Sequence, residues 1–195
     1  MTRLFAVLAL AAGLLFGAEA RAMTVLPLYL DEMADTAAVA FEGRCVANRS
    51  EVDAATGLVV TYTTFEVLDV LKGSAGATHE IKQVGGALPG DGAQYRVPGV
   101  PKFEVGEEYV VFLAGVSSAG FSSPMGLSQG RFHVDRRAGV RKVGNGRDFW
   151  DLTRRIPAKV PPATRAEMDR SDQPLREMDL QEFKQMVRAH LGAKR

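Results

Sequence analysis

The stretch of residues 59–73 constrains the fold more than any other feature of this sequence. Its side chains alternate at the two-residue period of a β-strand, and it ends in a glycine that suits a turn. Val70 and Leu71 interrupt the alternation, which predicts a β-bulge near residues 68–69. A bulge of this kind lets one long strand bend through both sides of a small closed barrel. The predicted strand places Val59, Thr61, Thr63, Phe65 and Val67 on one face and Val60, Tyr62, Thr64 and Glu66 on the other.

Residues 1–22 have the pattern of a secretory signal peptide. Arg3 precedes an uninterrupted apolar run over residues 4–18, and small residues follow at the positions that a signal peptidase recognises. We expect cleavage after Ala22, with Ala20 as the alternative, and a mature protein that is periplasmic or secreted. An uncleaved membrane anchor is the other interpretation, but it needs about 20 apolar residues. We therefore expect no stable membrane insertion after cleavage.

The composition of the mature chain is that of one domain with an appendage. Cleavage after Ala22 leaves 173 of the 195 residues, with 22 basic and 22 acidic side chains. Because the net charge is then near zero, the overall charge of the protein does not favour binding to nucleic acid, and we expect no nucleic-acid partner. Cys45 is the only cysteine, so no internal disulfide can form. Its strand phase predicts a buried small side chain in preference to a reactive or dimer-forming thiol.

The rest of the chain predicts an all-β domain with peripheral helices. Strand-like segments with glycine-rich corners and no alternation with helices favour an all-β barrel or sandwich of five to six strands over residues 23–149. A short N-terminal helix is predicted within residues 27–36. The expected strands lie at residues 37–47, 59–73, 79–84, 109–114, 126–135 and 140–143.

Residues 150–195 differ in composition from the preceding domain. Four prolines within residues 153–174 predict an extended linker over the surface. Asp179 then begins a C-terminal amphipathic helix, because Glu182 follows it at the spacing of a capping box. We expect this helix to pack on the barrel through an apolar stripe. The stripe consists of Leu180, Phe183, Val187 and Leu191.

Several short segments resemble a known family. The chain looks like small exported bacterial proteins with a TIMP-like (netrin-module-like) oligonucleotide/oligosaccharide-binding fold, over about residues 30–143. The resemblance implies a five-stranded Greek-key barrel with a helix packed across it. Animal inhibitors of this fold chelate a protease zinc through an N-terminal cysteine, and the mature end here has none, so that mechanism is not implied. The similar segments are Ala34-Asp35, Phe41-x-Gly43, Phe65-x-Val67 to Leu71-Lys-Gly73, Gly85-Gly86 and Phe103-x-x-Gly-Glu-x-Tyr109-Val-Val-Phe-Leu113.

No combination of residues in the sequence predicts catalysis. The three histidines are scattered, and neither a nucleophilic serine in a strand–turn–helix setting nor a cysteine–histidine pair is recognisable. His133 and Asp135 share a strand face and are weak candidates for metal ligands, but no third ligand stands at a suitable spacing. A solvated polar face is the simpler interpretation. We therefore expect a protein that is not an enzyme and has no cofactor.

Two features predict a binding surface. The long loop of residues 85–101 carries Tyr95 and Arg96, residue types that interfaces favour. The second is the strand face with Tyr62, Thr64 and Glu66, near which OB-like barrels bind ligands. We expect a non-catalytic binding or accessory protein that contacts another exported protein. The family resemblance implies a secreted protease as that partner. The alternative is a carbohydrate or small-ligand binding module that uses the barrel groove.

Overall fold

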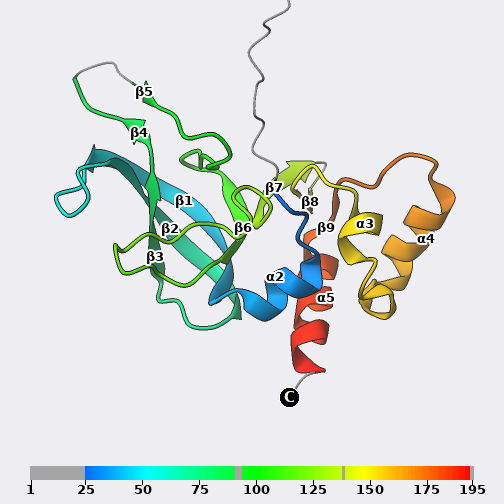
Figure 1. The fold of residues 1–195 in the computed structure, drawn as a ribbon. Coiled ribbons are helices and arrows are strands. Elements are labelled where there is room, and N and C mark those ends of the chain that lie inside the picture. The colour runs from blue at the N-terminus through cyan, green and yellow to red at the C-terminus, as the bar shows by residue number, and fades with distance from the viewer. Residues whose placement is uncertain (1–24, 91–93, 138, 194–195) are drawn as a thin grey trace, which may run out of the picture.

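The computed structural model describes residues 25–90, 94–137 and 139–193, so the predicted signal peptide lies outside the described residues. The described chain is mostly β, and seven of its strands form one antiparallel sheet (Figure 1). No helix in these ranges is long and apolar enough to cross a membrane. The order across the sheet is β3 (Thr78–Val84), β2 (Val59–Lys72), β1 (Val39–Val52), β6 (Glu108–Leu113), β7 (Arg131–Arg137), β8 (Val140–Gly144) and β9 (Met178–Asp179).

Strands β1 and β2 form the long, bent centre of this sheet. Glu42 lies opposite Asp69 and Gly43 lies opposite Val67, so Leu68 has no residue opposite it. The bulge that the sequence predicts near residues 68–69 is therefore confirmed. β1 also pairs with β6 along its first six residues, which makes β1 the strand that joins the two halves of the sheet.

The strands do not close into the expected barrel. Among the described strands, β3 and β9 are the two edges of the sheet, and no pairing joins them. The short strand β9 pairs with β8 at Lys142 and Val143 and so covers the edge of β8. The edge of β3 is partly covered by a loop, in which Ser122 donates its N–H to the carbonyl of Lys82 at 3.0 Å. A second, two-stranded sheet contains β4 (Gly86–Ala87) and β5 (Gln94–Tyr95).

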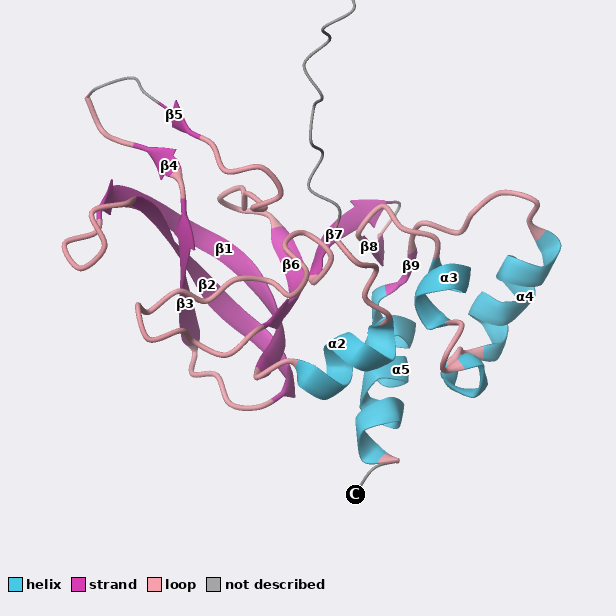
Figure 2. Cartoon of the chain, in the orientation of Figure 1, coloured by secondary structure: helices cyan, strands magenta, loops and turns pink. Residues whose placement is uncertain are grey.

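The helices gather at the opposite end of the molecule from the β4–β5 hairpin (Figure 2). The short N-terminal helix is α2 (Leu30–Thr36), and the C-terminal helix is α5 (Leu180–Gly192). The carboxylate of Asp179 caps α5 by accepting hydrogen bonds from the backbone N–H groups of Gln181 and Glu182. Between α2 and α5 in the sequence, the remaining helical elements are α3 (Phe149–Thr153), the 3-10 turn η1 (Pro157–Lys159) and α4 (Pro162–Arg170).

Helix α4 occupies part of the stretch that the sequence analysis expects to be extended. Two consecutive prolines, Pro161 and Pro162, stand at the start of this helix, where the missing N–H of proline costs nothing. Thr164 donates a hydrogen bond to the carboxylate of Glu182 and so fastens α4 to α5. The prolines therefore begin a helix here and do not extend the whole segment.

Alternating side chains divide the core between the two faces of the sheet. One cluster contains Phe112 and Phe132 and is covered by α2, α3 and α5. The other cluster lies on the opposite face, and the buried thiol of Cys45 belongs to it, as the sequence predicts. Burial raises the pKa of that thiol. This second cluster consists of Phe41, Cys45, Phe65, Ile81, Phe103, Tyr109, Val111 and Leu113.

Candidate ligand pocket

A cavity of about 330 Å³ lies between the second face of strands β1–β3 and the segment that follows β3. Its size is at the small end of the range for ligand pockets. Figure 1 shows the β4–β5 hairpin extending past the ends of β1–β3, away from the helices. We call this cavity the loop pocket. The sheet contributes Asn48, Ser50, Thr61, Thr63 and Gln83 to its floor, and residues 84–87, 95–97 and 100–104 form its walls.

The floor of the loop pocket is polar because five side chains from three neighbouring strands share one face. Ser50 on β1 pairs with Thr61 on β2, and Thr61 pairs with Gln83 on β3. Asn48 and Thr63 form the next pair along β1 and β2. Residues that pair across antiparallel strands project from the same side of the sheet. The five side chains therefore lie together beneath residues 84–87, 95–97 and 100–104.

Hydrogen bonds fix the row that contains Ser50 and Thr61. The hydroxyl of Thr61 donates to the backbone carbonyl of Gly85 at 2.7 Å. Because that bond uses the only hydroxyl proton of Thr61, Ser50 must be the donor in the 2.9 Å contact between the two hydroxyls. Gly86 lies directly above both hydroxyls, and a Cβ atom there would collide with them. The row is consequently rigid, and the acceptor lone pairs of Ser50 are not used within it.

The second row anchors the far wall of the loop pocket to the sheet. The hydroxyl of Thr63 donates to Asn48 Oδ1 at 2.7 Å, and Asn48 Nδ2 donates to the backbone carbonyl of Phe103 at 2.7 Å. The ring of Phe103 packs edge-on against Phe65 and Tyr109, with centroids 4.9 Å and 5.0 Å away. The wall formed by residues 100–104 is thus fixed to the core beneath it.

Gln83 is the unusual member of the floor. Its side chain is only 3 % exposed, and its Nε2 atom has no hydrogen-bond partner anywhere in the described chain. A buried amide donor that is left unpaired costs about 1–3 kcal/mol. Native structures satisfy nearly all such groups, so an exception on a residue that lines a cavity is a candidate ligand contact. Gln83 therefore marks the loop pocket as a candidate binding site.

The structure places Tyr95 and Arg96 at the rim of the loop pocket. Both residues line the cavity, and the ring of Tyr95 is 47 % exposed. The guanidinium of Arg96 donates to Gln94 Oε1 through Nε at 3.0 Å and Nη2 at 2.8 Å. These contacts leave the tyrosine ring and one edge of the guanidinium group turned toward solvent and the pocket mouth.

Tyr62, Thr64 and Glu66 lie on the opposite face of β2 from the pocket floor. The guanidinium carbon of Arg49 stacks 4.3 Å from the centroid of the Tyr62 ring. Glu66 pairs with Arg44 at 3.3 Å. The sequence analysis gives two candidate binding surfaces, the loop and this strand face. Of these two, only the loop lies at the cavity.

His133 and Asp135 both lie on β7, and each contacts a different partner. His133 Nε2 lies 3.0 Å from a carboxylate oxygen of Glu107, and Asp135 accepts a hydrogen bond from Arg137 Nε at 2.6 Å. That hydrogen bond lowers the pKa of Asp135. Within the described ranges no group of three or more histidine, cysteine, aspartate or glutamate residues is arranged to hold a metal ion.

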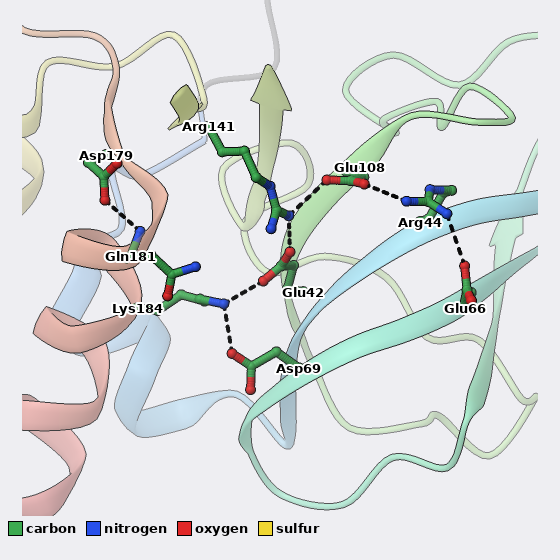
Figure 3. Close-up of polar contacts among 9 residues, drawn as sticks. All are labelled: Glu42, Arg44, Glu66, Asp69, Glu108, Arg141, Asp179, Gln181 and Lys184. Atoms are coloured by element: carbon green, nitrogen blue, oxygen red, sulfur yellow. Dashed lines mark hydrogen bonds and ion pairs between the residues drawn. The ribbon is translucent and has the colours of Figure 1, made fainter. Parts of the chain in front are cut away.

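A second polar cluster joins α5 to the sheet and is shown in Figure 3. The ammonium group of Lys184, which is 5 % exposed, lies 2.6 Å from Glu42 and 2.8 Å from Asp69. Arg141 bridges Glu42 and Glu108. Glu42, Asp69 and Glu108 each have a cationic partner, so these ion pairs fasten the helix to the sheet.

Glu108 shows how closely the charges of this cluster are matched. Burial alone would raise the pKa of its carboxyl group, but the hydrogen bond from Arg44 at 2.7 Å and the charge of Arg141 outweigh that effect. The pKa of Glu108 is consequently lowered. The carboxylate stays ionised and is not suited to transfer protons near neutral pH.

No family model, no curated protein and no solved structure matches this chain.

Sequence reasoning identified the rim of the pocket but missed its floor. The signal for the floor was present in β2, where Thr61 and Thr63 share a face with the apolar residues Val59, Phe65 and Val67. Two hydroxyl groups on a core-facing phase indicate either a buried hydrogen-bond network or a cavity. Gln83 and Ser50 could not be added to them from the sequence, because their position depends on the pairing of three strands.

Proposed function

We propose that this protein is a non-catalytic binding protein of the periplasm or the cell exterior, and that the loop pocket is its ligand site. The observation that carries the proposal is the unpaired Nε2 atom of Gln83 at the floor of the cavity. A ligand oxygen at that position would satisfy a donor that is otherwise buried at a cost. The anchored walls also support the proposal, because a preformed pocket loses little conformational entropy on binding.

A thermal-shift screen tests this proposal directly. The mature protein is screened against small polar metabolites and saccharides, and each hit is repeated with the Gln83→Met variant. A ligand that binds the native state raises the melting temperature by mass action. We expect hits that stabilise the wild-type protein and leave the variant unchanged. Hits that stabilise both proteins equally would place the binding site elsewhere.

Protein contact through the same loop is the second candidate function. Tyr95 and Val97 are 47 % and 38 % exposed on adjoining parts of the loop, and such aromatic and apolar side chains are enriched at interfaces. The resemblance to TIMP-like proteins suggests a secreted protease as the partner. A pull-down from periplasm or culture fluid with wild-type protein and the Tyr95→Ala variant tests this function. Capture that is independent of Tyr95 would exclude the loop as the contact.

The relation to OB-like barrels belongs to the same proposal. A long bulged strand, β1, is shared between β2 on one side and β6 on the other, and an aromatic cluster fills the face enclosed by its bend. These features support an OB-like arrangement in which the C-terminal segment occupies one edge of the sheet. The polar end of that enclosed face is the floor of the loop pocket.

A further inference from the structure

The floor of the loop pocket offers both an unused donor and an unused acceptor. Gln83 Nε2 is a donor without a partner in the part of the chain that the structure describes. Ser50, which also lines the cavity, donates its hydroxyl proton to Thr61, so its lone pairs are what it can offer a ligand as acceptors. A ligand that satisfies the floor must therefore accept one hydrogen bond and donate another.

The spacing of these two groups limits the shape of the ligand. Thr61 stands between Ser50 and Gln83 in the same row, so their backbones are two strand spacings apart, about 9–10 Å. Because the two groups come from β1 and β3, on either side of β2, a ligand with polar groups at separate positions suits them better than a single small polar atom. A ring that carries several hydroxyl groups presents donors and acceptors at separate positions along its edge and suits this spacing.

The charge of the floor limits the ligand further. The floor residues are all uncharged, whereas Arg96, Lys102 and Glu104 stand exposed on the walls. A carboxylate on the floor would meet the lone pairs of Ser50, and an ammonium group would meet the N–H of Gln83. Neither charge would find an opposite charge among the floor residues themselves. The floor consequently favours a neutral ligand over a charged one.

The rim of the loop pocket adds an aromatic surface above this floor. Tyr95 lines the cavity with a half-exposed ring, which offers an apolar face beside a polar hydroxyl. The C–H groups on the face of a sugar ring match such a surface, while its hydroxyl groups match the floor. The combination distinguishes a sugar from a linear polyol, which has no flat apolar face.

From these observations we infer that the loop pocket binds a neutral carbohydrate, with Gln83 and Ser50 contacting its hydroxyl groups and Tyr95 packing against its ring. The inference rests on the proposed function, in which the loop pocket is the ligand site. It adds the chemical class of the ligand and the atoms that select it.

A panel of monosaccharides that are matched in structure and differ in charge tests the inference on the mature full-length protein. The panel contains neutral hexoses and N-acetylhexosamines, the corresponding hexosamines with an ammonium group, and the corresponding hexuronates with a carboxylate. Binding is measured by isothermal titration calorimetry. We expect at least one neutral sugar to bind more tightly than its charged counterparts by about tenfold, since each charged form leaves one floor group unpaired.

Variants of the floor assign the contacts. Gln83→Glu keeps the size of the side chain and replaces the donor with an acceptor, and we expect it to weaken sugar binding by about tenfold or more. Ser50→Ala removes only the acceptor and is expected to weaken binding as well. Thr64→Val is the matched control, because Thr64 is a polar residue of β2 on the face of the sheet opposite the pocket. We expect this variant to bind like the wild-type protein.

The outcomes separate this inference from the proposed function. Tighter binding of a hexuronate or a hexosamine, lost in the Gln83→Glu variant, would overturn the neutral-sugar inference and leave the pocket as the ligand site. Binding only of a ligand that is not a carbohydrate, lost in the Gln83→Glu variant, would likewise overturn the neutral-sugar inference and leave the pocket as the ligand site. Sugar binding that persists in both floor variants, or the absence of any ligand that depends on Gln83, would overturn both.

Discussion

Replacing Gln83 with methionine should stabilise the protein and abolish ligand binding at the same time. The amide is 3 % exposed and its Nε2 atom is unpaired, so the native state without ligand bears a desolvation cost of about 1–3 kcal/mol. Methionine has a similar length and no group that needs a partner, and swaps that conserve volume are well tolerated. A gain of about 1 kcal/mol would raise the melting temperature of a domain this size by roughly 2–4 °C.

Urea unfolding followed by circular dichroism measures the stability, and the thermal-shift screen measures binding. The matched control is Gln185→Met, because Gln185 is an exposed glutamine on α5 and its replacement should change stability by less than about 0.5 kcal/mol. If Gln83→Met is less stable than the wild-type protein by 1 kcal/mol or more, the amide makes a favourable interaction and the reasoning fails.

Three further predictions concern the charges and the thiol outside the pocket. Lys184→Met leaves the buried carboxylate of Glu42 short of a cation and should lower the free energy of unfolding by about 3 kcal/mol in urea. The hydrogen bond from Lys82 lowers the pKa of Asp53 below its ordinary value of 3.8. The stability that this pair contributes is therefore fully present above pH 3.8 and is lost as the pH falls through the lower pKa of the folded state. Asp53→Asn should flatten the acid limb of a stability–pH curve. Cys45 is fully buried and its thiol pKa is raised, so a thiol reagent at pH 8 should label it only after unfolding.

Each of these predictions has a result that contradicts it. For Lys184, unfolding within about 0.5 kcal/mol of wild type would mean that the buried pair contributes nothing net. For the pair of Asp53 and Lys82, an acid limb that is unchanged by Asp53→Asn would show that the salt bridge does not form in solution. For Cys45, rapid labelling of the native protein would show that the thiol is accessible.

Short-range patterns predicted much of the fold. The alternation around residues 59–73 gave the phase of β2, and its interruption located the bulge at Leu68. The same kind of argument assigned Cys45 to the core and Asp179 to the cap of α5. These predictions depend only on neighbouring residues, so no knowledge of the distant chain was needed.

The features that were missed depend on contacts between distant segments. Met178 and Asp179 form a strand of two residues, too short to show a period, yet they pair with β8 and form one edge of the sheet. The prolines before α4 indicate an extended segment or a helix start equally well. The unpaired amide of Gln83 could not be foreseen either, because it depends on residues 84–87, 95–97 and 100–104 lying over three strands.

The side-chain amide of Gln83 provides the most direct test of the loop pocket. Its two protons give a resolved pair of signals in a nitrogen–proton correlation spectrum, assigned by their loss in Gln83→Met. We predict that a ligand found in the screen shifts this pair as it saturates the protein, together with the backbone signals of Thr61 and Tyr95. If saturation leaves the Gln83 pair unchanged and moves signals elsewhere, such as the indole N–H of the exposed Trp150, the loop pocket is not the binding site.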